Sequence, residues 1–419
     1  MFNRCAAKVM RMGFNSSKFL TRNVVSSTKT NQNNFGLLLA GAAGFAAATF
    51  AGYTAFSNAY ANEDSVSVSE ITKKHSASIS NSALKSNLRI FSGNSNRVLA
   101  EEICTELGIK LGNCSVSRYA DGEVNVNINE PVRGKDIYII QSTCPPNIND
   151  NLMELMLMIS TVRRASARKI TAVIPYYGYA RQDRKMTSRV PISAADVARL
   201  LESMGVDRVV AVDLHCGQIQ YYITIIIFIY LFQGFFGPRV PVDNLQGGVV
   251  GVDYFSNQIK LENPVIVSPD AGGVYRVKKF REGLARKQIE SGLAMIIKQR
   301  GKPGQIEQMD LVGSVSGCDC VIVDDMIDTA GTLCKAAMKL RESGAKRVFA
   351  FASHGVFSKN ANDNITKSVL EQVVVLNTVP LSVASRENEK IITLSVAPLL
   401  ANCIRAIHSK QSVSQIFEE

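Results

Sequence analysis

The stretch Val321–Thr332 reads VIVDDMIDTAGT, and it decides the fold that the sequence predicts. An apolar, β-branched strand ends in two acids, and a turn of Thr and Gly then opens the helical pattern TLCKAAMKLRESG. The backbone N–H groups of residues 329–332 would face one concavity at the helix N-terminus, where phosphate binds readily. Gly331 permits close approach of a ligand, and Asp324 and Asp325 can accept hydrogen bonds from sugar hydroxyls. The alternative is a solvated acidic turn that caps a helix, but the combination of features favours a sugar-phosphate site.

Similar strands recur on both sides of this stretch. From about Leu88 onward, short β-branched runs alternate with amphipathic helical patterns; Leu99, Ile103 and Leu107, for example, recur every four residues and predict a helix that stops at Gly108. The expected strands are LRIF, VNVNI, DIYIIQS, ITAVIP, RVVAVDLH, PVIVSPDAGG, DCVIVDDM, RVFAFASHG and QVVVLN. Alternation of this kind predicts a parallel α/β architecture, in which sites gather at the carboxyl ends of the strands.

The composition fits a globular protein that acts on small anions. The 419 residues are 46% hydrophobic and 20% charged, with a net charge of +11. Six of the 47 basic residues and no acidic residue lie in residues 1–62; the remaining 41 basic residues against 36 acidic ones give a net charge of only +5. This mild charge, without a dense basic stripe, argues against nucleic acid as a partner. The nine cysteines are scattered and indicate reduced thiols.

The first 86 residues precede the α/β body. Residues 1–62 have the composition of an organellar transit peptide followed by a charge-free sorting or anchor segment, Phe35–Phe56. We therefore expect a mitochondrial location, with a plastid or the cytoplasm as alternatives, and membrane attachment through residues 35–56. A merely disordered basic tail is the alternative interpretation. Residues 63–86, rich in Ser, Lys and Asn, read as a polar linker.

The motifs together resemble one family. Val321–Thr332 resembles the phosphoribosyl-pyrophosphate (PRPP) motif of type I phosphoribosyltransferases, and YADGEVNVNI, NDNLMEL, YYGYARQDRK, SRVPISA, DLHCGQIQ, PVDNL and SPDAGG are similar to ribose-phosphate pyrophosphokinases from about Leu88 to Phe417. The resemblance implies an α/β fold with two tandem phosphoribosyltransferase-like domains, residues 87–220 and 234–419, each with a mostly parallel sheet flanked by helices. It also implies a homo-oligomer (a hexamer of dimers), the substrates ATP and ribose 5-phosphate, and Mg²⁺. The reaction would move the diphosphoryl group of ATP to O1 of ribose 5-phosphate, giving PRPP and AMP.

The resemblance also assigns residues to ATP and to the metal ion. The ATP-binding positions are Tyr119, Asp121, Gly122, Glu123, Arg181, Gln182 and Asp183. A tyrosine ring offers a stacking face and an arginine fork matches phosphate geometry, although RQD alone is more often a surface turn. His215 and Asp270 would hold the metal ion, with Asp213 as a helper, and phosphate oxygens and water would complete its shell. A lone histidine is otherwise more often structural.

The ribose 5-phosphate and catalytic positions lie in the second half of the chain. The ribose 5-phosphate set is Arg300, Asp324, Asp325, Asp328, Thr329, Ala330, Gly331 and Thr332, and the pyrophosphate-facing turn is Ala271, Gly272 and Gly273. Lys298 and Arg300 in MIIKQRGKPG would be the catalytic cations, at the end of a strand that enters a loop able to close over substrate. A solvated basic turn is the alternative.

One segment departs from the family pattern. Residues 221–233, YYITIIIFIYLFQ, interrupt the phrase DLHCGQIQGFF, and GFFGPRVPVD carries two extra residues. The block is too short for a bilayer span. Its composition is typical of A/T-rich noncoding DNA read through, so we expect a retained intron, with a genuine insertion as the second hypothesis. Its position beside His215 keeps open a noncatalytic, regulatory paralogue, and a phosphoribosyltransferase that consumes PRPP is the third reading.

Overall fold

A computed structural model describes residues 87–185, 187–216, 234–299 and 308–417. Two sheets and one two-stranded hairpin form the β-structure of these residues. The transit and anchor segments expected in residues 1–62, the linker 63–86, the block 221–233 and Arg300 all lie outside the described residues. Within the described part of the chain, no helix is long and apolar enough to cross a membrane.

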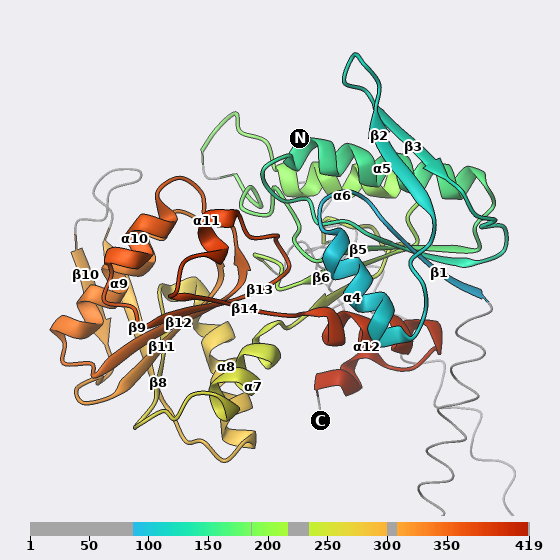
Figure 1. Cartoon of the computed structure of the whole chain (residues 1–419). Coiled ribbons are helices and arrows are strands. Elements are labelled where there is room, and N and C mark those ends of the chain that lie inside the picture. Colours follow the sequence, from blue (N-terminus) through green and yellow to red (C-terminus); the bar gives the residue numbers. More distant parts are fainter. Residues whose placement is uncertain (1–86, 186, 217–233, 300–307, 418–419) are drawn as a thin grey trace, which may run out of the picture. The chain divides into compact units, whose positions relative to one another are not determined.

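The first sheet is entirely parallel and lies between two pairs of helices (Figure 1). Its strands, in spatial order, are β1 (Leu88–Ser92), β4 (Asp136–Ile140), β5 (Lys169–Ile174), β6 (Arg208–Val212) and β7 (Val242–Leu245). Helices α5 (Ile148–Arg164) and α6 (Ser193–Ser203) pack on one face. Helices α4 (Arg97–Leu107) and α12 (Ala397–His408) pack on the other face and against each other.

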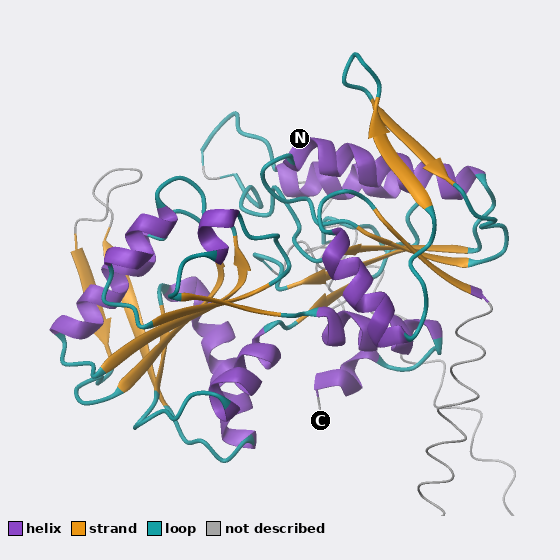
Figure 2. Cartoon of the chain, viewed as in Figure 1, coloured by secondary structure: helices purple, strands orange, loops and turns teal. Residues whose placement is uncertain are grey.

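The second sheet has seven strands, of which one edge strand is antiparallel. In spatial order they are β10 (Gln308–Val312), β9 (Gly292–Gln299), β8 (Val265–Ser268), β11 (Asp319–Ile327), β12 (Arg347–Gly355), β13 (Gln372–Leu376) and β14 (Ile391–Leu394). Helices α7 (Gly248–Asn257) and α8 (Val274–Arg286) cover one face, and α9 (Gly331–Glu342) and α10 (Ala361–Lys367) cover the other (Figure 2). The short helices α11 (Val383–Arg386) and η2 (Val413–Phe417) complete the chain.

The two sheets repeat one pattern. In each, a first strand (β1 or β8) is followed by a two-stranded excursion, and four further strands then line up in chain order beside it. The excursion is the hairpin β2 (Cys114–Arg118) with β3 (Val124–Ile128) in the first half and β9 with β10 in the second. This repetition agrees with the expected pair of α/β domains with mostly parallel sheets.

The helix expected from the Leu99 pattern is confirmed as α4. The side chain of Asn96 accepts a hydrogen bond from the Leu99 backbone N–H at 3.3 Å, which satisfies one free donor of the first turn. The helix ends at Gly108, whose φ of 66° is left-handed and favours glycine. Leu99, Ile103 and Leu107 are buried, as their spacing predicts.

Sheet membership places the domain boundary elsewhere than at residue 234. Strand β7, residues 242–245, pairs with β6 and therefore belongs to the first sheet. The last long helix, α12, returns to pack against α4 of the first half. Local sequence patterns show that a strand or helix forms, but they do not show which sheet it joins, so the expected start of the second domain was too early.

A buried histidine joins the two halves at the carboxyl ends of their strands. His354, in β12, is 2% exposed; its Nε2 donates to the Val212 carbonyl at 3.0 Å, and its Nδ1 pairs with the Thr378 hydroxyl at 2.8 Å. The neighbouring Ser353 hydroxyl donates to the Asp213 carboxylate. Burial lowers the pKa of His354, which keeps the ring neutral. These contacts hold the end of β6 against β12 and so position the residues that follow β6.

Candidate active site

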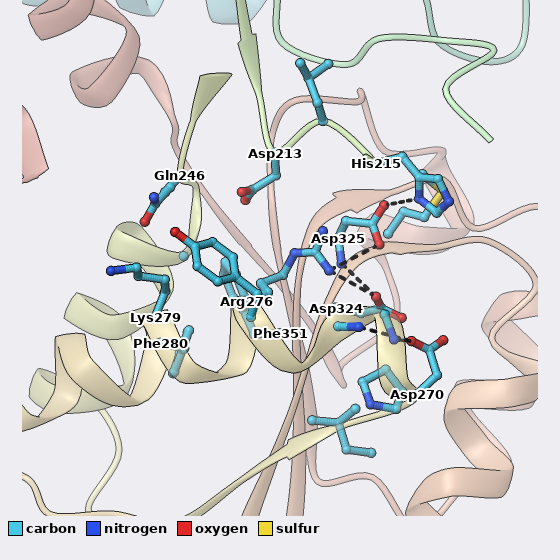
Figure 3. Close-up of a pocket in the computed structure, with 18 of the residues that line it drawn as sticks. Asp213, His215, Gln246, Asp270, Arg276, Lys279, Phe280, Asp324, Asp325 and Phe351 are labelled. Atoms are coloured by element: carbon cyan, nitrogen blue, oxygen red, sulfur yellow. Dashed lines mark hydrogen bonds and ion pairs between the residues drawn. The ribbon is translucent and has the colours of Figure 1, made fainter. Parts of the chain in front are cut away.

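A large open cavity of about 2180 Å³ lies where the strand ends of the two halves meet. Its wall comes from the residues after β6, the turn after β8, the face of α8 and the turn after β11 (Figure 3). Parallel sheets bind ligands at this edge. Among the expected site residues, the cavity is lined by Arg181, Asp183, Asp213, His215, Asp270, Ala271, Gly272, Gly273, Asp324, Asp325, Asp328, Thr329, Ala330 and Thr332.

The turn Asp328–Thr332 has the geometry expected of a phosphate cradle. It lies between β11 and the start of α9, a helix of 12 residues. The first backbone N–H groups of such a helix have no partner within the helix, so at this turn they are available to a ligand. Ala330 is the N-cap with φ 58°, a left-handed conformation that is costly for a residue with a side chain. Gly331, which we expected to permit close approach of a ligand, is the first residue of α9.

Asp324 and Asp325 differ in their electrostatics although they are adjacent. Burial and the charge of Asp325 raise the pKa of Asp324 to about 8. Burial works in the same direction on Asp325, but the hydrogen bond with His215 and the charge of Arg276 outweigh it and lower its pKa. Asp325 is therefore the ionised partner, and Asp324 holds a proton near neutral pH.

His215 and Asp325 form a direct contact between the two halves. The His215 Nδ1 lies 2.7 Å from the Asp325 carboxylate, and this hydrogen bond raises the pKa of His215 against the opposing effect of burial. The charge of Asp183 adds to this effect. The sequence placed these residues in a metal set and a sugar set, and the structure brings the two sets together.

The three expected metal ligands do not form a closed protein cage. Asp213 accepts hydrogen bonds from the Gly247 N–H at 2.9 Å and from Ser353, and Asp270 caps the turn at Gly272 and Gly273 at 3.0 and 3.2 Å. Within the ranges that the structure describes, no group of three or more His, Cys, Asp or Glu side chains could hold a metal ion by itself. Mg²⁺ commonly binds through one or two carboxylates plus substrate phosphates and water, so a partial set at the cavity wall suits it.

The turn after β8 is shaped for close approach. Asp270 adopts an extended conformation at the start of the 3₁₀ turn η1 (Ala271–Gly273), and its carboxylate orients the backbone N–H groups of that turn. A Cβ atom at Gly273 would lie 2.8 Å from the Ser268 hydroxyl, so a larger residue there would displace Ser268. The turn lines the cavity beside Asp324 (Figure 3).

Two residues of the RQD phrase, Arg181 and Asp183, line the cavity, and Gln182 does not. Arg181 donates from a guanidinium nitrogen to the Asp328 carboxylate at 2.6 Å, which joins the expected ATP loop to the sugar-phosphate turn. Hydrogen bonds from Ser358 and Arg181 lower the pKa of Asp328 despite its partial burial. Gln182, by contrast, accepts from Ser193 at the start of α6 and is not part of the cavity wall.

The remaining ATP positions lie away from this cavity. Residues 119–123 form the tip of the β2–β3 hairpin, which projects from the first half (Figure 1). Tyr119 is 56% exposed, and its hydroxyl donates to Asn125 on the same hairpin at 3.2 Å. Gly122 has φ 95°, as the hairpin turn requires. Tyr119, Asp121, Gly122 and Glu123 therefore do not meet Arg181 across the cavity of their own chain.

The catalytic cations are only partly within the described residues. Lys298 lies on β9, beyond Met295, which pairs with Ser268 of β8. The backbone at Lys298 thus extends past the carboxyl end of β8, on the side of the sheet edge where Asp270 begins the next turn. Arg300 lies outside the described residues.

One cavity residue was missed by the sequence argument. Arg276, in the first turn of α8, lies 3.6 Å from Asp325 and 3.7 Å from Asp324. In the sequence it stands within VYRVKKFR, where several cations of a polar helix look alike. Its proximity to SPDAGG was the available signal, because the first turn of a helix after such a loop faces the loop's ligand.

Comparisons with known proteins agree on one family. A model described as the N-terminal domain of ribose phosphate pyrophosphokinase matches residues 88–205, and one described as the phosphoribosyl synthetase-associated domain matches residues 263–418. The ribose-phosphate pyrophosphokinase of Vibrio parahaemolyticus is 51% identical over 331 residues, covering 79% of this chain and 99% of the relative. That of Buchnera aphidicola is 49% identical over 332 residues, with the same shares.

A solved structure shows the same arrangement. The phosphoribosylpyrophosphate synthetase of Mycobacterium smegmatis superposes with a TM-score of 0.68 at 38% identity, over 77% of this chain and 99% of that one. This chain therefore belongs to the family of ribose-phosphate pyrophosphokinases, and the catalytic interpretation is favoured over a regulatory paralogue.

Proposed function

We propose that the cavity binds ATP and ribose 5-phosphate side by side and transfers the diphosphoryl group between them. The O1–Pβ bond forms as the bond from Pβ to the α–β bridging oxygen breaks, and the O1 hydroxyl releases its proton to solvent. The products are PRPP and AMP, and AMP keeps the bridging oxygen. The observation that carries this proposal is the 2.6 Å contact of Arg181 with Asp328. It brings the phrase expected to bind ATP into contact with the phrase expected to bind ribose 5-phosphate.

The turn after β11 would hold ribose 5-phosphate. Backbone N–H groups at the start of α9 bind the 5-phosphate, and the hydroxyls of Thr329 and Thr332 add donors on the same wall. Asp325, ionised, accepts from a ribose hydroxyl. Asp324, with its raised pKa, is able to donate as well as accept near neutral pH.

Mg²⁺ would be held by Asp270 and His215 together with phosphate oxygens and water. His215 Nδ1 contacts Asp325, which leaves Nε2 as the atom available to a ligand. When bound, the ion would neutralise the diphosphate charge and polarise its oxygens. The chain itself contributes Asp213 as a fixed acceptor that orients the loop carrying His215.

Positive charge at the transition state would come from Lys298 and Arg300. Phosphoryl transfer depends on positioning and charge stabilisation more than on covalent catalysis. Lys298 lies on β9, whose backbone extends past the carboxyl end of β8, the strand that leads into the pyrophosphate-facing turn. Arg300, two residues further on, would also meet the ribose 5-phosphate.

Completion of the ATP site would require a second copy of the chain. Tyr119, Asp121 and Glu123 lie on an exposed hairpin that does not line the cavity of its own chain. In a homo-oligomer this hairpin would reach the cavity of a neighbour and supply the ring that stacks on adenine. The oligomer would then be required for activity, and dilution to monomers would raise the KM for ATP.

The direct test is formation of AMP from ATP by the purified chain, with and without ribose 5-phosphate. We expect AMP only when ribose 5-phosphate and Mg²⁺ are both present, and a strong loss in Lys298→Ala. AMP formation that ignores ribose 5-phosphate would overturn the proposal. No AMP from the chain alone, with stimulation of an added active relative, would support a regulatory paralogue instead.

We also propose import into an organelle, the mitochondrion first. The support is the acid-free basic composition of residues 1–62 and the charge-free run 35–56, which would also attach the protein to a membrane. A fusion of residues 1–62 to a fluorescent reporter should collect in mitochondria. A diffuse cytosolic signal would contradict the proposal, and a plastid signal would select the alternative compartment.

A further inference from the structure

Arg276 is a partly buried cation that lies among acidic side chains. Its side chain is 21% exposed and lines the cavity (Figure 3). The charges of four carboxylates act on it and, against the effect of burial, raise its pKa; these are Asp325, Asp213, Asp324 and Asp270. The cavity wall also carries Arg181, Arg184 and Lys279. An anionic diphosphate is held most favourably where such cations meet it.

The pairing of Arg276 is open, unlike that of other arginines in the same fold. Arg347 forms a closed, two-armed pair with Asp319 at 3.0 and 2.6 Å. Arg168 does the same with Asp136 at 2.8 and 2.5 Å. Arg276 instead remains 3.6 and 3.7 Å from its carboxylates, beyond hydrogen-bond distance. Its N–H groups are therefore not saturated by the acids that surround it.

The open guanidinium lies beside the pyrophosphate-facing turn. A Cβ atom built on Gly273 would be 3.9 Å from a guanidinium nitrogen of Arg276, so the two line one part of the wall. Arg276 lies in the first turn of α8, and α8 begins directly after the pyrophosphate-facing turn. A planar fork with free N–H groups at this position matches two phosphate oxygens.

We propose that Arg276 is a catalytic residue that binds the diphosphoryl group as it moves from ATP to ribose 5-phosphate. This rests on the proposed function and deepens it by adding a cation on helix α8 to Lys298 on β9 and Arg300 beyond it. The charges of Asp324 and Asp325 attract the guanidinium, but neither carboxylate forms a hydrogen bond with it, so its N–H groups can donate to phosphate oxygens. A residue that served only as counterion to Asp324 and Asp325 would have closed on them, as Arg347 closes on Asp319.

The test compares two ligands on the full chain by titration calorimetry. Inorganic pyrophosphate with Mg²⁺ probes the diphosphoryl position, and ribose 5-phosphate probes the cradle at α9. In Arg276→Met we expect the Kd for pyrophosphate to rise about tenfold to a hundredfold, the factor for losing a charged hydrogen bond, and the Kd for ribose 5-phosphate to change little. In Arg276→Lys the rise should be smaller, because the charge remains and the fork is lost.

Arg347→Met is the matched control. It removes an arginine from an ion pair at the opposite, amino end of β12, so it should lower the Tm and leave both Kd values unchanged. Unchanged pyrophosphate binding in Arg276→Met, or equal weakening of both ligands, would overturn the inference. If Arg276→Met does not fold, Arg276→Lys decides: pyrophosphate binding equal to that of the parent overturns it. Failure of the proposed function is seen separately, as a parent chain that makes no AMP with ribose 5-phosphate.

Discussion

Asp328→Asn separates the two substrates, because Asp328 contacts the ATP loop while lying in the sugar-phosphate turn. The change removes the negative charge of the Asp328 carboxylate. One of its oxygens lies 2.6 Å from a guanidinium nitrogen of Arg181, and the other accepts a hydrogen bond from the Ser358 hydroxyl. The Arg181 side chain is 54% exposed, so this ion pair contributes no more than about 1 kcal/mol to the free energy of unfolding. A hydrogen bond from ribose 5-phosphate to a charged acceptor contributes more, about 1.5–3 kcal/mol.

The expected kinetic pattern is therefore asymmetric. The KM for ribose 5-phosphate should rise about tenfold to a hundredfold, while the KM for ATP stays level or falls, since Arg181 no longer has to leave Asp328 to meet a phosphate. Initial rates of AMP formation, with one substrate varied and the other saturating, give both constants. Equal increases in the two KM values, or a loss of stability of several kcal/mol, would refute the reasoning.

Lys298→Ala should lower kcat by about a hundredfold or more with little change in fold, as measured by rapid-quench AMP formation and circular dichroism; activity within a few-fold of the parent would exclude its role. The pKa of Asp324 is raised to about 8 in the folded state, whereas an unfolded chain releases this proton near pH 4. Between about pH 4 and pH 8 the folded state therefore binds more protons than the unfolded state, so the free energy of unfolding should fall as the pH rises from 4 to 8. Denaturant titrations should show this slope in the parent and a shallower one in Asp324→Asn, with Mg²⁺ offsetting the loss at high pH; identical slopes would contradict the assignment. Deletion of residues 221–233 should give soluble, active enzyme, because the flanking Cys216 and Gly234 both line the cavity; a mature transcript that contains these codons, with equal activity and solubility of both versions, would favour a genuine insertion.

Much of the fold could be predicted from short apolar runs. DCVIVDDM and RVFAFASHG became the buried central strands β11 and β12, because continuous β-branched sequence suits a strand covered on both faces. Strand β7, VDNL, has only two apolar residues, so the sequence pattern did not predict it. The pairing of β7 with β6 and of α12 with α4 depends on contacts between distant parts of the chain, which local periodicity does not contain.

The part of the candidate site that could be predicted from the sequence consists of residues that are consecutive in the chain. The acids and turn of Val321–Thr332 line the cavity because strand, turn and helix are consecutive in the chain. Arg276 could not be distinguished from its basic neighbours, since only the folded helix places it beside Asp324 and Asp325. Tyr119 illustrates the reverse case: the phrase was recognisable, yet its position on a projecting hairpin is a property of the fold.

In the proposed reaction, one cavity transfers the β- and γ-phosphoryl groups of ATP together. The most direct measurement uses ATP labelled at the β-phosphorus and follows the label in the products with the full chain, Mg²⁺ and ribose 5-phosphate. We predict that the label appears in PRPP in proportion to the AMP formed. Label retained in ADP would indicate transfer of the terminal phosphate alone, and label released as free pyrophosphate without ribose 5-phosphate would indicate hydrolysis; either result would contradict the account.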